Sequence, residues 1–120
     1  MKKRILVIDD EEILTRSFAL LLEKKGYEVL TVKNGQDAEA IIDEEVIDLV
    51  ISDIRMPGMN GIEVVKLIRS KHENIPVIFV TGYADQKLQE EAQKLNPTAY
   101  VHKPFDALEL TEIVKSSLGS

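Results

Sequence analysis

The sequence contains no cysteine, which excludes disulfide bonds and thiolate chemistry. Aromatic residues make up only 5% of the chain, so aliphatic side chains must form most of its core. It also lacks a long apolar run. The run at residues 5–8 stops at two aspartates, too soon for a signal peptide or a membrane span. These absences predict a cytoplasmic protein.

Positive charge is also scarce, because 15 lysines and arginines stand against 21 aspartates and glutamates, for a net charge of −6. A negative chain repels phosphate backbones and anionic lipids, so we expect it to bind neither nucleic acid nor membrane. Its 120 residues suit one domain, and no linker or repeat divides them. We expect a single domain at residues 1–118 and interpret residues 119–120 as a cloning remnant.

Short apolar runs alternate with segments of helical period along the whole chain. This alternation predicts an α/β fold, in which repeated strand–helix units form a parallel sheet covered on both faces. The predicted strands are residues 4–8, 27–32, 48–52, 76–80 and 99–102, and the predicted helices are residues 11–25, 35–44, 60–71, 85–95 and 106–118.

Capping residues support these boundaries. Asn34, Asn60 and Asp106 stand where side chains accept hydrogen bonds from the first turn of a helix. Gly26 follows the first predicted helix, and Asn96, before a proline, is able to take the left-handed conformation that ends the fourth.

Four of the predicted strands end on reactive polar groups. Asp9 and Asp10 follow the first strand and Asp53 the third, while Thr81 and Lys103 follow the fourth and fifth. The carboxyl ends of parallel strands meet at one edge of a sheet, where ligands of such folds bind. The sequence therefore predicts a phosphoryl-transfer site with room for a divalent cation.

The paired aspartates have an alternative explanation as a helix N-cap with an acidic first turn. Against it, two carboxylates ~4 Å apart repel each other by about 4 kcal/mol at an effective dielectric near 20. A cation relieves that repulsion, and Mg²⁺ fits because it prefers hard oxygen ligands and bridges to phosphate.

A carboxylate such as Asp53 can accept a phosphoryl group when a metal and hydrogen-bond donors neutralise the incoming charge. The Thr81 hydroxyl and the Lys103 ammonium are suitable donors to phosphoryl oxygens. Singly, each of these residues is an ordinary polar strand end or a solvated charge. Their joint occurrence at four strand ends favours the functional interpretation.

These motifs resemble the receiver domain of bacterial response regulators, over nearly the whole chain. The resemblance implies a flavodoxin-like, doubly wound sheet of five parallel strands in the order 2-1-3-4-5, with five helices. The motifs that carry it are Asp9-Asp10-Glu11-Glu12, Asp53 through Gly61, Thr81-Gly82-Tyr83 and Tyr100 through Phe105.

The resemblance also implies the metal and phosphate ligands. Asp53 is the implied phosphoacceptor, and Asp10 and Asp53 are the implied direct ligands of Mg²⁺. Asp9 would assist through the ion's waters, and the backbone carbonyl of Arg55 would supply a further ligand.

Further roles follow from the same resemblance. Thr81 and Lys103 would bind the phosphoryl oxygens, and the Lys103–Pro104 peptide bond would be cis. Tyr100 would turn inward when Thr81 moves toward the phosphate. That motion would remodel the surface made by the fourth helix, the fifth strand and the fifth helix.

The chain departs from the common family pattern in places. Asn96-Pro97 stands where Gly-Ala is usual, which predicts an altered end of the fourth helix. Arg55 and Tyr83 occupy positions that, in the family this chain resembles, gate the approach of water to the phosphoaspartate, and such bulky side chains are expected to slow its hydrolysis.

As partners, the resemblance implies a sensor histidine kinase or a histidine phosphotransfer protein as phosphoryl donor. It also allows an output domain or a downstream protein as the receiver of the signal, and a homodimer through the surface of the fourth helix, fifth strand and fifth helix. The chain would catalyse only its own phosphorylation and dephosphorylation, so it is not predicted to be a substrate-turning enzyme.

Three other functions deserve comparison. An Mg²⁺-dependent aspartyl-phosphate phosphatase typically has a second aspartate two residues after its nucleophile, where this chain has Arg55. A flavodoxin-type carrier cradles phosphate after its first strand, where the acidic run at residues 9–12 would repel it. A receiver-like interaction module without phosphorylation would have no need of the complete set of polar strand ends.

Overall fold

The computed structural model describes residues 2–10, 12–56, 59–82 and 86–119, without the side chains of residues 12–15, 56 and 59. Its main sheet has five parallel strands, which confirms the predicted α/β class. These strands are β1 (Arg4–Ile8), β2 (Glu28–Val32), β3 (Leu49–Asp53), β6 (Val77–Thr81) and β7 (Ala99–His102). Their order is β2-β1-β3-β6-β7, which is the predicted 2-1-3-4-5.

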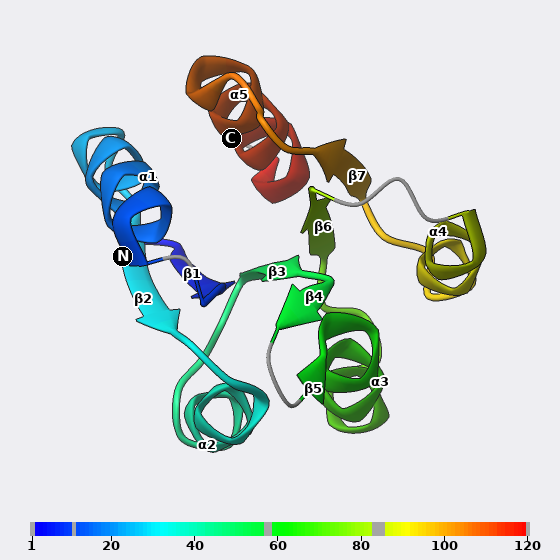
Figure 1. The fold of residues 1–120 in the computed structure, drawn as a ribbon. Coiled ribbons are helices and arrows are strands. Elements are labelled where there is room, and N and C mark those ends of the chain that lie inside the picture. The colour runs from blue at the N-terminus through cyan, green and yellow to red at the C-terminus, as the bar shows by residue number, and fades with distance from the viewer. Residues whose placement is uncertain (1, 11, 57–58, 83–85, 120) are drawn as a thin grey trace.

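In the described part of the chain, five helices cover the two faces of this sheet (Figure 1). They are α1 (Glu12–Lys24), α2 (Gly35–Glu44), α3 (Gly61–Lys71), α4 (Gln86–Gln93) and α5 (Ala107–Leu118). Helices α1 and α5 lie on one face, and α2, α3 and α4 lie on the other. None of the helices in the described ranges is long and apolar enough to cross a membrane.

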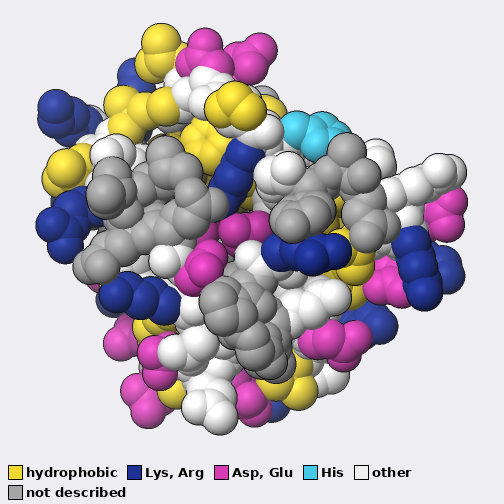
Figure 2. Space-filling model, viewed as in Figure 1, with side chains coloured by type: hydrophobic (Ala, Val, Ile, Leu, Met, Phe, Trp, Pro, Cys, Tyr) yellow, Lys and Arg dark blue, Asp and Glu magenta, His cyan; other side chains and the backbone are white. Residues whose placement is uncertain are grey.

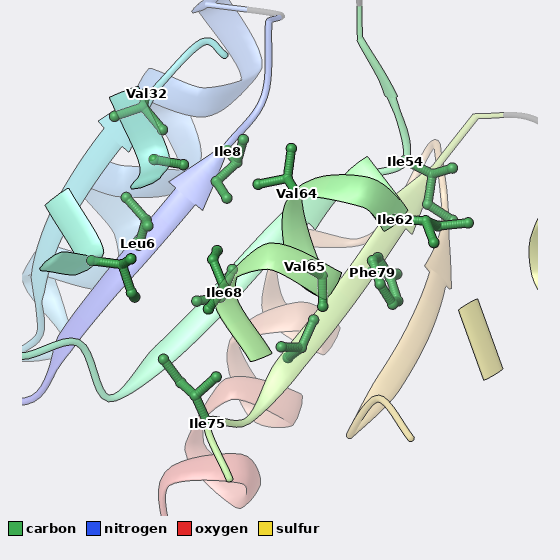
Figure 3. Packing of buried hydrophobic residues seen from close by; sticks show 14 of the residues in the cluster. Leu6, Ile8, Val32, Ile54, Ile62, Val64, Val65, Ile68, Ile75 and Phe79 are labelled. Atoms are coloured by element: carbon green, nitrogen blue, oxygen red, sulfur yellow. The ribbon is translucent and has the colours of Figure 1, made fainter. Parts of the chain in front are cut away.

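The core consists of two apolar clusters, one on each face of the sheet. Because side chains of a strand alternate between faces, Ile5 and Val7 of β1 pack on the side of α1 and α5. Leu6 and Ile8 point to the opposite side, toward α2 and α3 (Figure 3). Burial of the central strands on both faces fixes their register and so the position of every strand end.

The predicted helix N-caps are confirmed. Asn34, Asn60 and Asp106 precede α2, α3 and α5 with extended backbones. Their side-chain oxygens accept hydrogen bonds of 2.8, 2.7 and 2.8 Å from the backbone N–H groups of Asp37, Ile62 and Leu108, respectively.

Two helices end on left-handed glycines at the edge of the sheet where the strands begin. Gly26 (φ 98°) donates its N–H to the Glu23 carbonyl, and the next residue, Tyr27, donates to the Leu22 carbonyl. This paired arrangement closes the end of α1. Gly119 (φ 70°) closes α5 in a similar way, so it is part of the helix cap. Ser120, the other half of the predicted cloning remnant, lies outside the described residues.

Helix α4 ends at Gln93, two residues before the predicted boundary. Asn96 adopts the predicted left-handed conformation, with a φ of 51°. The guanidinium of Arg69, on α3, donates hydrogen bonds to the carbonyls of Leu95 and Ile75 and so ties the segment after α4 to α3. Burial lowers the pKa of Arg69 from its ordinary value.

The segment after β3, predicted as a turn-rich loop, contains a small antiparallel hairpin. Its strands are β4 (Arg55–Met56) and β5 (Met59–Asn60). Strands of two residues are too short to show the alternation by which strands are predicted from sequence.

Candidate functional site

Three carboxylates gather at the carboxyl edge of the sheet. Parallel pairing of β1 with β3 places Asp9 and Asp10 beside Asp53, and one oxygen from each lies within 4.8 Å of the others. Asp9 is only 9% exposed and Asp53 only 6%, while Asp10 is exposed. Figure 2 shows Asp and Glu side chains in the middle of this face with Lys or Arg side chains close to them. The predicted clustering of these three residues is present in the structure.

Lys103 is shared between two of these carboxylates. Its Nζ lies 3.0 Å from Oδ2 of Asp9 and 3.0 Å from Oδ2 of Asp53. The lysine side chain is only 10% exposed, so both ion pairs are largely shielded from water. The backbone N–H of Lys103 donates to the Thr81 carbonyl (2.7 Å), and the Lys103–Pro104 peptide bond is cis.

The environment of Asp53 disfavours its charge. Burial is the largest cause and raises its pKa above the ordinary value of 3.8. The hydrogen bond and charge of Lys103 act in the opposite direction. The negative charge of Asp9 raises the pKa of Asp53 further, and the Arg55 N–H, 3.2 Å from Oδ1, lowers it. The net effect is a raised pKa of Asp53, so a bound cation would stabilise the ionised carboxylate.

A raised pKa means that ionised Asp53 opposes folding at neutral pH. We therefore expect Asp53→Asn, which is uncharged at every pH, to raise the free energy of unfolding near pH 7 by about 1 kcal/mol in metal-free buffer. The gain should shrink as the pH falls toward the ordinary pKa, because folded wild-type protein then takes up the proton. Urea denaturation of both proteins across that range measures the effect, and a gain independent of pH would contradict it.

The backbone of Asp53 is held by two residues that the sequence prediction did not single out for this role. The Ser52 hydroxyl donates to the Asp53 carbonyl at 3.0 Å. Gly61, the first residue of α3, lies against that carbonyl, and a Cβ on Gly61 would be 1.9 Å from the Asp53 oxygen. Its N–H also donates to the Ile54 carbonyl at 2.6 Å. The first residue of α3 is therefore in direct contact with the backbone of Asp53.

The remaining predicted site residues lie around this centre. Thr81 is 1% exposed and is the last residue of β6. It pairs with His102 of β7, the residue before Lys103. Tyr100 is half-buried on β7, and its ring contacts His102 edge to face with centroids 5.3 Å apart. Arg55 is exposed beside Asp53. Tyr83 lies outside the described residues.

The donor set suits a hard divalent cation. All three clustered side chains offer carboxylate oxygens, and neither sulfur nor imidazole joins them among the described residues. Oxygen-only sites favour Mg²⁺, Ca²⁺ or Mn²⁺ over softer metals. The residues present therefore fit a cation, which would neutralise charge that the single ammonium of Lys103 leaves unbalanced.

Fold and site together define a doubly wound α/β domain with an acidic, cation-compatible pocket at the carboxyl edge of its sheet. The chain belongs to the response regulator receiver domain family, whose model matches residues 5–115. This result confirms the family resemblance that the motifs indicated.

Individual relatives agree with this assignment. Sporulation initiation phosphotransferase F of Bacillus subtilis is 35% identical over 118 residues, which cover 98% of this chain and 95% of the relative. Regulatory protein AtoC of Escherichia coli is 38% identical over 115 residues, 96% of this chain but only 25% of AtoC. The chain thus matches a quarter of the length of AtoC and nearly all of the Bacillus protein.

Solved structures show the same fold. The CheY-like response regulator receiver domain protein from Methanospirillum hungatei aligns with a TM-score of 0.95 at 31% identity, over 99% of this chain and 95% of that one. A DNA-binding response regulator of the LuxR family from Staphylococcus aureus aligns with a TM-score of 0.87 at 36% identity, over 97% and 98%.

Proposed function

We propose that this chain is a phosphorylation-driven switch of a two-component system, with Asp53 as its phosphoacceptor. The observation that carries the proposal is the position of Asp53, which is buried at a strand end beside two other carboxylates and hydrogen-bonded to Lys103. Phosphorylation would alter the chain itself, and no substrate would be turned over. A cytoplasmic location follows from the proposed donor, a cytoplasmic phosphohistidine.

The proposed cofactor is Mg²⁺, which Asp10, Asp53 and the backbone carbonyl of Arg55 would hold directly and Asp9 would hold through the ion's waters. Bound there, the ion would supply positive charge to the transferring phosphoryl group. Clustering of the three carboxylates supports this assignment.

In the proposed reaction, an Asp53 carboxylate oxygen attacks the phosphorus of a phosphohistidine on a sensor kinase or histidine phosphotransfer protein. An O–P bond forms, the P–N bond breaks, and the imidazole leaves with the electron pair. The ammonium of Lys103 lies 3.0 Å from Asp53 Oδ2, so it would be close enough to donate to an oxygen of the phosphoryl group once that group is attached. The Thr81 hydroxyl would donate to another, and hydrolysis would later reset the switch.

The proposed output runs through Thr81 and Tyr100 to the surface of α4, β7 and α5. Movement of Thr81 toward the phosphoryl group would vacate space beside the half-buried Tyr100 ring. That surface would then contact an output domain, a downstream protein or a second copy of the chain. Arg55 and Tyr83 would set the lifetime of the phosphoaspartate.

Intact-protein mass spectrometry after incubation with Mg²⁺ and acetyl phosphate tests the proposal. The wild type is expected to gain one labile phosphoryl group, and a chelator should abolish the gain. Asp53→Asn should gain none. Asp106→Asn is a matched control, because asparagine caps a helix as well as aspartate does, and it should be modified like the wild type. Equal modification of Asp53→Asn, or folded wild-type protein that stays unmodified with Mg²⁺, would overturn the assignment.

A further inference from the structure

Lysine side chains line a groove at the edge of the sheet where the strands begin, opposite the acidic cluster. The groove lies between the residues that precede β1, the turn after α1 and the last turns of α5, and has a volume of about 360 Å³. Lys2, Lys3, Lys25 and Lys115 line it, and all four are exposed. Glu112 is the one carboxylate among its described lining residues. In a chain of net charge −6, this is a local concentration of positive charge.

The lysines of this groove differ from most other basic residues in being unpaired. Elsewhere most of the described basic side chains take part in ion pairs, hydrogen bonds or other polar contacts, as Arg4 does with Glu28 and Lys71 with Asp43. Among the described residues, the lysine and arginine side chains without such a contact are Lys2, Lys3, Lys24, Lys25, Lys94 and Lys115. Four of these six line the one groove.

An ordinary explanation for lysines at this edge is compensation of helix C-termini, whose free carbonyls carry partial negative charge. That explanation covers Lys115, in the last turn of α5, and Lys25, directly after α1. The ends of α1 and α5 are closed by Gly26 and Gly119, which bond the terminal carbonyls through backbone N–H groups. Lys2 and Lys3 belong to no helix, so capping does not explain their presence.

We infer that this groove binds a linear polyphosphate, either inorganic or as the phosphate chain of a nucleotide. Lysine ammonium groups bind phosphates as mobile point charges. The groove volume falls within the range of small-molecule sites, ~300–1,000 Å³. A long polyanion would extend beyond the lysines and be repelled by the net negative charge of the chain, whereas a compact one stays within the lysines. Half-buried Tyr27, in the groove wall, offers a ring on which a nucleotide base can stack.

Titration of the full chain tests this inference without involving the acidic pocket. Tripolyphosphate and ATP are added separately in metal-free buffer with a chelator, and backbone amide shifts are followed by NMR. We expect saturable one-to-one binding, with the largest shifts at Lys25, Gly26 and Thr111 and little change at Asp53. Shifts that never saturate, or that centre on Asp53, would overturn it.

Charge-neutral variants locate the binding. Lys3→Gln combined with Lys25→Gln should weaken tripolyphosphate binding at least about tenfold, the factor for one lost charge-assisted hydrogen bond. Lys24→Gln combined with Lys94→Gln removes the same charge from unpaired lysines outside the groove and should change affinity less than twofold, roughly, by loss of long-range attraction alone. If both double variants weaken tripolyphosphate binding equally, the loss reflects net charge alone, and the groove is not the binding site.

Two further comparisons identify the ligand. If Tyr27→Leu weakens ATP but leaves tripolyphosphate unchanged, the groove is a nucleotide site; if both are unchanged, the phosphate chain alone is recognised. A poly-glutamate peptide that binds more tightly than tripolyphosphate would overturn the ligand class in favour of an acidic protein segment. Since this edge is remote from Asp53, none of these outcomes depends on the proposed phosphorylation.

Discussion

Gly61→Ala is expected to destabilise the protein by roughly 3 kcal/mol and to slow phosphorylation of Asp53 about a hundredfold. The added Cβ would lie 1.9 Å from the Asp53 carbonyl oxygen and 2.9 Å from its carbonyl carbon. Neither atom is the end of a flexible side chain, so α3 or the end of β3 must move. Either movement displaces the carboxylate that the site is built around. Urea denaturation measures the first effect, and the rate of mass gain with acetyl phosphate measures the second.

Gly82→Ala is the matched control for this substitution. Among the described residues, a Cβ on Gly82 would meet only the Lys103 Cβ at 3.8 Å, an ordinary contact. This variant should therefore stay within about 0.5–1 kcal/mol of the wild type, since alanine only restricts the unfolded chain. Equal stability and equal phosphorylation rates for the two variants would show that the close approach of Gly61 has no effect.

Lys103→Met should destabilise the protein by about 3 kcal/mol near neutral pH in metal-free buffer. The change leaves Asp9 and Asp53 facing each other without the ammonium that lies 3.0 Å from both. Because Lys103 lowers the pKa of Asp53, its loss should raise that pKa further. The deficit in unfolding free energy should therefore shrink as the pH falls and the carboxyl group is protonated. Added Mg²⁺ should also restore part of it.

Lys71→Met provides the comparison, because Lys71 also bridges two carboxylates, those of Glu39 and Asp43, at 3.2 and 3.0 Å. All three of those side chains are at least 39% exposed, and exposed ion pairs contribute ~0–1 kcal/mol. Although the ion-pair distances are similar, the two substitutions should lower the free energy of unfolding by very different amounts, which urea denaturation of both variants measures. A loss from Lys103→Met no larger than that from Lys71→Met would contradict the role of burial.

Much of the fold was predictable because its signals are local. The apolar runs gave the five strands to within one residue at each end, and Asn34, Asn60 and Asp106 mark helix starts through bonds to residues two or three positions away. The order of the strands was different: alternation predicts a parallel sheet, but only the family resemblance supplied the order 2-1-3-4-5.

The acidic cluster was predictable for the same reason, since strand ends meet at one edge whatever the details of packing. The backbone contacts that hold Asp53 in place could not be predicted from the sequence. The contact of Gly61 with the Asp53 carbonyl depends on how closely α3 approaches β3, and nothing in the sequence gives that distance. The hairpin of β4 and β5 escaped prediction because a two-residue strand has no period.

Among the described helices, α4 is the one least anchored in the core. Within its eight residues, all of them described, Ala92 alone is buried. A helix this short is not stable by itself in water, so its order depends on the few contacts that it makes. Arg69 ties down the loop that follows it. In terms of native-state hydrogen exchange, α4 should open with a small free energy while the sheet stays closed, so a signal that acts on it shifts a local unfolding equilibrium rather than deforming the core.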